Sequence, residues 1–344
     1  MLILSIESSC DETACAIIKA QNGIFELSSS IISSQIVEHE KYGGVVPELA
    51  GRHHLELCTN VVRLALDQAD ITLGDIDLVA STRGPGLSAA LLVGMTAGKS
   101  YAMALEKPFV GIHHHEAHIL SVLLEHDDVQ FPFLAVLVSG GHTMFVIVDA
   151  PGSYRVMGGT IDDAAGEAYD KVSRMLGLGY PGGPIVDDLA EKGDPSIYKL
   201  PRPMKDNLYN VSFSGLKTAT KYLIRDNPDA KVEDICASFQ EAVVDTLSIR
   251  IKNILKFMSA EEKPAKAISL GGGVAANSAL RNAVENLSTK NKIRALIPEK
   301  IMCTDNAAMI GVCAYYHYKL RGEDELNIGI HSTWDLTALN IEQI

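Results

Sequence analysis

The chain has 344 residues, of which 47% are hydrophobic and 21% are charged, so its composition is globular with apolar material for about two domains. A net charge of −13 argues against tight autonomous binding of nucleic acid, because such binding depends on Lys and Arg neutralising phosphates. Six scattered cysteines without a CxxC pair argue against a disulfide scaffold and favour a reducing cytosol. The amino terminus has no basic start, and its apolar stretch is too short for a signal peptide.

The first third of the chain predicts strands followed by alternating helices and strands. "LILSIES" and "TACAIIK" are rich in Ile and flank a polar turn, which is typical of two paired strands. A third strand is expected at "GIFELSSSIISS", a helix over 48–70, a strand at "DLVAST", a helix over 88–105 and a strand at "KPFVGI". The helix over 88–105 is expected to be buried rather than membrane-spanning, because Lys99 and small polar residues interrupt its apolar run.

The pattern restarts at Phe133 with "FLAVLVS", a "GG" turn and "HTMFVIVD". Later come the strand "AKAISL", a glycine loop with a helix, the strand "IRALIP" and a last helix with Asp305 or Thr304 as its N-cap; 177–212 is the longest loop-like region. This repetition predicts an α/β fold with duplicated mixed sheets in two lobes around a central cleft. We expect an amino-terminal lobe, 1–124, joined by the tail 325–344, and a carboxy-terminal lobe, 125–324, with an inserted basic segment, 177–225.

Two glycine turns predict anion or nucleotide contacts. "SGGH" (139–142) joins two strands and "LGGGVAAN" (270–277) joins a strand to a helix, so backbone N–H groups can approach a ligand closely. Either turn alone is more often only a turn, and neither matches a P-loop. Together they resemble the actin–hexokinase–chaperone superfamily, although Glu7-Ser8-Ser9 replaces the usual Asp-x-Gly and weighs against kinase chemistry.

The segment "GIHHHEAHIL" predicts either a metal pair or a polar helix near the surface. His114 and His118 are four residues apart, so on a helix they share one face. Glu116 lies two residues after His114 and points away from that face, which disfavours a zinc protease. A carboxylate would complete a set suited to Fe(II), with Zn not excluded, and Asp305 is a candidate. Such an ion would bridge both halves of the molecule.

Ten ordered blocks resemble the TsaD family, the tRNA adenosine threonylcarbamoyltransferases once labelled O-sialoglycoprotein endopeptidases. The resemblance runs almost from end to end, and the histidine block fits the family pattern H-H-x-E-x-H. The blocks are "ESSCDETA", "GGVVPELAGRHH", "RGPGLSAALLVG", "HHHEAH", "LVSGGHT", "GEAYDKV", "YPGGP", "SFSGLKT", "GGVAAN" and "CTDNAAMIG".

This resemblance implies an enzyme that transfers a threonylcarbamoyl group from threonylcarbamoyl-AMP to the exocyclic amine of the adenosine beside the anticodon, in tRNAs reading codons that begin with adenine. It implies one divalent metal, Fe(II) before Zn, held by His114, His118 and Asp305, and ATP, ADP or threonylcarbamoyl-AMP in the cleft. No protein nucleophile is required, and the catalytic residue stays unassigned, with Asp11 and Glu12 as candidate proton acceptors. The implied substrate contacts are Leu137, Val138, Ser139, Gly140, Gly141, Asp170, Gly183, Asp187 and Asn277.

The implied partners are tRNA, a TsaB-like protein and a TsaE-like ATPase, in the cytoplasm and without a membrane. Lys199, Arg202, Lys205, Lys217, Lys221 and Arg225, with interleaved aromatics, are expected to line an RNA path. The helix 48–69 and the segment 88–105 are expected to contact the TsaB-like partner. The competing hypotheses are a nucleotide-responsive assembly module of the same complex without its own chemistry, a small-molecule kinase and a peptidase.

Overall fold

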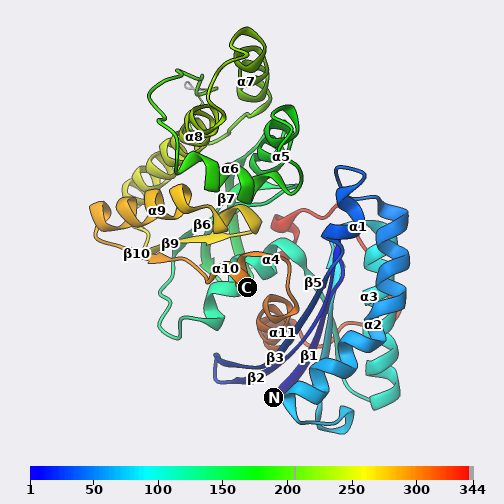
Figure 1. The fold of residues 1–344 in the computed structure, drawn as a ribbon. Helices are drawn as coiled ribbons and strands as arrows, with labels where there is room; N and C mark the ends of the chain where they lie inside the picture. The colour runs from blue at the N-terminus through cyan, green and yellow to red at the C-terminus, as the bar shows by residue number, and fades with distance from the viewer. Residues whose placement is uncertain (205–206, 341–344) are drawn as a thin grey trace. The chain divides into compact units, whose positions relative to one another are not determined.

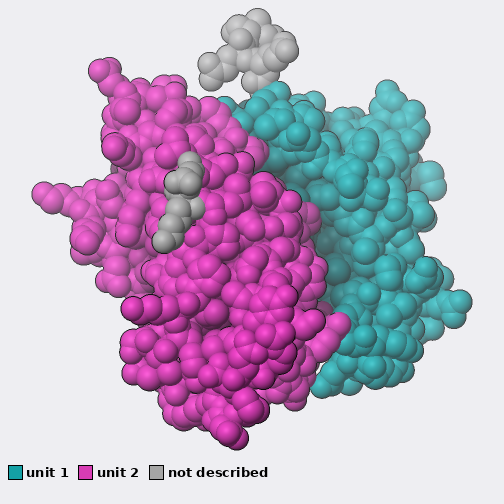
Figure 2. All heavy atoms as spheres, turned by 90° about the horizontal axis from the view of Figure 1, so that it is seen from above, with its two compact units in different colours: residues 1–129, 151–154, 304–344 teal, residues 130–150, 155–303 magenta. Residues whose placement is uncertain are grey.

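The computed structural model describes residues 1–204 and 207–340, which divide into two compact units (Figures 1 and 2). Unit 1 comprises 1–129, 151–154 and 304–344, and unit 2 comprises 130–150 and 155–303. These bounds differ from the expected lobes mainly at residues 304–324. The sequence-based division gave them to the second lobe, whereas their helix packs on the first sheet.

Unit 1 is built on a five-stranded mixed sheet with the strand order β3-β2-β1-β4-β5. β1 and β2 are antiparallel, as are β2 and β3, whereas β4 is parallel to both β1 and β5. The strands are β1 Leu2–Glu7, β2 Glu12–Gln21, β3 Ile24–Ser34, β4 Leu78–Gly84 and β5 Phe109–His113. The helices are α1 Ile36–Glu40, α2 Pro47–Ala69, α3 Ser88–Leu105, α4 His114–Leu120 and α11 Ala307–Arg321, with short 3₁₀ turns at Leu73–Asp75, Ser121–Leu124 and Leu336–Leu339.

Helices cover both faces of this sheet (Figure 1). α2 and α3 pack on one face, and α11 packs on the other, in contact with α4. The apolar run with small residues that was compared with a membrane span forms α3. Its small residues allow the helix to pack closely on the sheet. A Cβ at Gly94 would lie 2.3 Å from Ser8 Oγ, so only glycine lets this helix approach the end of β1 so closely.

Unit 2 repeats the same strand arrangement, with the order β10-β9-β6-β7-β8. β6 is antiparallel to β7 and parallel to β9, which is parallel to β10. The strands are β6 Phe133–Val138, β7 Thr143–Ala150, β8 Ser153–Gly159, β9 Ala267–Gly271 and β10 Arg294–Leu296. The helices are α5 Ala165–Met175, α6 Gly182–Ala190, α7 Ser214–Asp226, α8 Val232–Ala260, α9 Ser278–Asn291 and α10 Lys300–Cys303, with a 3₁₀ turn at Gly273–Ala276.

Most of the predicted elements are confirmed, including the strands on either side of both turns and the helix over 88–105. One expectation was wrong: the loop-like region 177–212 contains α6. Its nine residues follow a Gly- and Pro-rich turn, so the helix is too short to stand out from the surrounding loop by periodicity.

The glycine loop after β9 offers a matched test of backbone strain. Gly272 has φ +82°, and a Cβ there would lie 2.6 Å from the carbonyl oxygen of Val138, whereas a Cβ at Gly273 meets nothing within 4 Å. We expect Gly272→Ala to lower the free energy of unfolding by about 1–3 kcal/mol. Gly273→Ala should change it little, and urea unfolding of both variants measures the difference. Equal midpoints for the two variants would contradict this account.

Candidate metal centre and glycine-rich site

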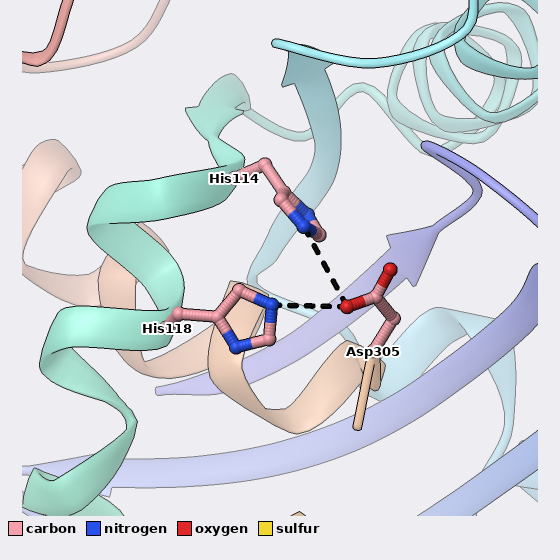
Figure 3. A group of neighbouring side chains, drawn as sticks. All are labelled: His114, His118 and Asp305. Atoms are coloured by element: carbon pink, nitrogen blue, oxygen red, sulfur yellow. Dashed lines mark hydrogen bonds and ion pairs between the residues drawn. The ribbon is translucent and has the colours of Figure 1, made fainter. Parts of the chain in front are cut away.

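Two imidazoles and one carboxylate converge in unit 1 (Figure 3). His114 and His118 lie one turn apart on α4, so both rings leave the same face of the helix. Oδ1 of Asp305 lies 2.9 Å from Nε2 of His118 and 3.6 Å from Nε2 of His114. One ligand atom from each side chain lies within 4.8 Å of the other two. All three residues belong to unit 1. The expectation that the ion would bridge both halves of the molecule was therefore wrong.

Asp305 reaches the histidines because its neighbour caps the helix. The N-cap of α11 is Asn306, whose Oδ1 accepts the N–H of Met309 at 3.0 Å. The expectation that Asp305 or Thr304 would be the cap was therefore wrong. With capping assigned to Asn306, the Asp305 carboxylate turns toward α4.

The ring of His114 is oriented from behind by the end of β1. Nδ1 of His114 lies 3.2 Å from Oε2 of Glu7 and 3.2 Å from Oγ of Ser9. Glu7 is fully buried, and its carboxylate also accepts the hydroxyl of Thr82 at 2.5 Å. A carboxylate that accepts the Nδ1 proton fixes the ring with Nε2 facing Asp305, which is how metal-binding histidines are usually oriented, and Nε2 can bind an ion once it gives up its own proton.

The electrostatics of the cluster favour a positive charge between its members. Burial alone would lower the pKa of His114, but the carboxylates of Asp305 and Glu7 outweigh it and raise this pKa to about 9. Burial, reinforced by the charges of Asp305 and Asp11, raises the pKa of Glu12 well above its usual range. The site therefore holds excess negative charge that a cation would compensate.

The residues present fit a divalent ion. Metal–nitrogen and metal–oxygen bonds of about 2.0–2.2 Å place neighbouring ligand atoms roughly 3.0–3.5 Å apart. The two distances to Asp305 bracket that range. Two imidazoles and one carboxylate also form the donor set of mononuclear Fe(II) and of some Zn sites.

Elemental analysis tests this fit on protein purified without chelator. We expect the wild-type chain to carry bound divalent metal and His118→Ala to lose it, because two ligands leave the ion too weakly held. His126→Ala is the control, since His126 lies in the same unit but outside the cluster. A full metal load in His118→Ala would show that these side chains do not hold the ion.

In unit 2, the predicted residues of the first glycine turn divide into core and open backbone. Leu137 and Val138 are buried in β6, so only their backbone could meet a ligand. In the turn, Ser139 N–H donates to the carbonyl of His142 at 2.8 Å. A Cβ at Gly140 or Gly141 would meet nothing within 4 Å, so space lies directly beside this backbone.

The remaining predicted contacts gather around α6. Gly183 and Asp187 lie one turn apart on this helix, and the carboxylate of Asp170 accepts the N–H of Gly182 at 2.7 Å. Burial raises the pKa of Asp170. Asn277 caps α9 and donates to Oδ1 of Asp187 at 3.0 Å. The structure thus brings these four residues together, and a Cβ at Gly183 would enter open space.

Asp187 accepts more hydrogen bonds than sequence reasoning anticipated. Gln240 of α8 donates to its carboxylate at 2.9 Å, and Ser278 donates through both its hydroxyl and its backbone N–H. Gln240 also accepts the amide of Asn277 at 2.7 Å. The only sequence signal for Gln240 is a polar residue inside the apolar run "ICASFQEAVV". A cavity of about 360 Å³ lies beside this network and is lined in part by Gln240 and Ser278.

Replacing this carboxylate tests its structural role. Asp187→Asn converts one acceptor oxygen into a donor facing the N–H groups around it, so we expect the free energy of unfolding to fall by about 1–3 kcal/mol. Asp188→Asn is the matched control, because Asp188 is the exposed next residue of the same helix. Chemical denaturation distinguishes the variants, and equal stability of the two would remove the role assigned to Asp187.

Comparison with known proteins assigns the chain to a family. The TsaD family, described as tRNA N6-adenosine threonylcarbamoyltransferase, matches residues 26–312. A protein of that name from Trichlorobacter lovleyi is 48% identical over 98% of this chain and 97% of its own length. Another from Thermosipho africanus is 46% identical over 93% of this chain and 95% of its own. The chain belongs to the TsaD family. The expectation of a transferase that modifies tRNA is confirmed at this level.

Solved structures support the fold of this TsaD chain. HypF in its phosphate- and nucleotide-bound form superimposes with a TM-score of 0.62 at 14% identity, over 94% of this chain and 47% of HypF, so the chain spans about half of that protein. Component A of (R)-2-hydroxyglutaryl-CoA dehydratase from Acidaminococcus fermentans superimposes with a TM-score of 0.53 at 13% identity, over 92% of this chain and 98% of its own. The expected α/β fold of the actin–hexokinase–chaperone kind, with duplicated mixed sheets, is confirmed.

Several cations in the basic segment of this TsaD chain are already paired. Arg202 binds Glu241 and Asp245, and Lys217 lies 2.5 Å from Asp163. Lys205 falls outside the described residues, as does its neighbour at 206. An RNA path here would have fewer unpaired charges than the sequence count indicates. Among the helices that the structure describes, none is long and apolar enough to cross a membrane.

Proposed function

We propose that this chain transfers a threonylcarbamoyl group from threonylcarbamoyl-AMP to the N6 amine of the adenosine beside the anticodon, in tRNAs reading codons that begin with adenine. Family membership over nearly the whole chain supports the reaction class. The observation that carries the proposal is the convergence of His114, His118 and Asp305 in unit 1.

We propose that these three side chains hold one divalent ion, Fe(II) before Zn. A bound ion supplies Lewis-acid chemistry toward the acyl group of the donor. Glu7 and Ser9 contribute by fixing the ring of His114 through Nδ1. The replacement of the kinase-type Asp-x-Gly by Glu7-Ser8-Ser9 thus has a role in this proposal, because Glu7 orients a histidine.

The proposed reaction balances without a protein nucleophile. The N6 nitrogen attacks the carbamoyl carbon, the bond from that carbon to the phosphate oxygen breaks, and AMP leaves with the electron pair. The proton lost from N6 needs an acceptor, and Asp11 and Glu12 are the proposed candidates. Asp11 lies in the turn between β1 and β2, and Glu12 is the first residue of β2. Burial raises the pKa of Glu12 well above its usual range, so its ionised form is a stronger base than an ordinary carboxylate.

Unit 2 is proposed to bind the donor or ATP or ADP. The backbone from Leu137 to Gly141 offers N–H groups to an anion, and the open space beside Gly140 and Gly141 supports this role. Asp170, Gly183, Asp187 and Asn277 gather on α6 and α9. Because Asp187 and Asn277 already hydrogen-bond each other, their proposed contribution is to shape the wall of the site as well as to contact the ligand.

We propose that the chain acts in the cytoplasm on tRNA, together with a TsaB-like protein and a TsaE-like ATPase. Exposed apolar side chains on α2 and α3, namely Leu55, Leu92 and Met103, support these helices as the surface for the TsaB-like partner. For tRNA binding, the proposed stacking residue of the basic segment is the exposed Tyr222, which lies beside Arg225 on α7.

A transfer assay tests the proposal. Purified chain with its partner proteins is given tRNA, ATP, bicarbonate, radiolabelled threonine and a synthase that makes the donor, and label in tRNA is measured. We expect Asp305→Ala to reduce transfer by about 100-fold or more, because loss of this ligand releases the ion that would polarise the acyl group of the donor. Asp188→Asn should transfer normally. Unchanged transfer by Asp305→Ala would favour the nucleotide-responsive module, with the chemistry performed elsewhere in the complex.

A further inference from the structure

The helix that carries both histidines is short and is held from outside by the carboxy-terminal tail. α4 has seven residues, so its own hydrogen bonds give it little rigidity. Two separate contacts connect it to residues 331–340 of the tail. Neither contact involves His114, His118 or Asp305.

The first contact runs through His113, the N-cap of α4. Nε2 of His113 lies 3.2 Å from the carbonyl oxygen of Trp334, and Nδ1 accepts the N–H of Glu116 at 3.4 Å. A proton on Nε2 satisfies both contacts, so the tail carbonyl selects the tautomer that caps the helix. The centroids of the Trp334 and His113 rings lie 4.8 Å apart, and Cζ of Arg83 lies 5.1 Å from the centroid of the Trp334 ring.

The second contact runs through Tyr154 to Glu116. The amide of Asn340 accepts the Tyr154 N–H at 2.6 Å and donates to the Tyr154 carbonyl at 2.9 Å. The hydroxyl of Tyr154 then donates to Oε1 of Glu116 at 2.6 Å. Tyr154 and Glu116 are both buried, so this chain of hydrogen bonds is shielded from water.

These contacts explain a residue that the metal cluster does not use. Glu116 sits on α4 between the two histidines and points away from their face. Its bond to Tyr154 fixes the rotation of the helix about its axis, and His113 fixes its first turn. Since a bound ion requires ligand positions within roughly 0.5 Å, both restraints act on the ligand geometry.

We propose that the tail 331–340 is a strap that sets the position of α4, and that Tyr154, Asn340 and Trp334 are positioning residues for the metal centre. This inference rests on the proposed metal site. It predicts that metal affinity depends on side chains that never touch the ion.

The test is a titration of metal-free protein with Co(II), in which binding is monitored by the visible absorption of the bound ion. The titration is done at a temperature well below the thermal unfolding midpoint of every variant. We expect Tyr154→Phe and Asn340→Ala each to weaken Co(II) binding about 10–100-fold and to alter the spectrum. The double variant should be no weaker than the weaker single variant, because both changes interrupt the same chain of contacts. Glu116→Gln keeps an acceptor for Tyr154 and should bind nearly as wild type.

Controls separate this inference from the metal site itself. Tyr101→Phe removes another part-buried tyrosine hydroxyl of unit 1, bonded to Thr59 and away from α4, and should leave Co(II) affinity unchanged. Tight binding by wild type, weak binding by His118→Ala and unchanged binding by both Tyr154→Phe and Asn340→Ala would overturn the strap alone. Equal binding by wild type and His118→Ala would overturn the metal site and the strap together.

Discussion

The approach of one carboxylate oxygen to two imidazoles is the interaction on which the account of this chain depends. One partner is a seven-residue helix that presents two histidines on one face, and the other is the residue just before the N-cap of a long, largely buried helix. The carboxylate is 187 positions from His118 in sequence, and only the packing of α11 on the first sheet brings them to 2.9 Å. The sheet of unit 1 therefore acts as the frame of the candidate metal centre.

The sequence predicts the histidine pair well, because the spacing of four residues has one geometric meaning on a helix. It also predicts both strand–turn–strand openings, since apolar runs with glycine or polar turns between them are strong local signals. Asp305 was identified, but its reason was misassigned: capping belongs to Asn306, and local pattern alone does not decide which of several neighbouring polar residues caps a helix.

Long-range polar contacts were beyond sequence reasoning. Glu7, Gln240 and Tyr154 each join residues that are remote in the chain, and a buried polar side chain looks like any other until its partners are known.

The two units also show how one topology serves two purposes. In the first unit, β1 ends at Glu7, which orients a histidine. In the second unit, the turn between β6 and β7 presents open glycine backbone suited to an anion.

Anomalous X-ray diffraction from crystals of chelator-free protein, recorded on both sides of the iron and zinc absorption edges, tests the central claim most directly. The account predicts one anomalous peak per chain, within bonding distance of Nε2 of His114, Nε2 of His118 and a carboxylate oxygen of Asp305. Crystals of active protein without such a peak, or with the peak on other side chains, would contradict it.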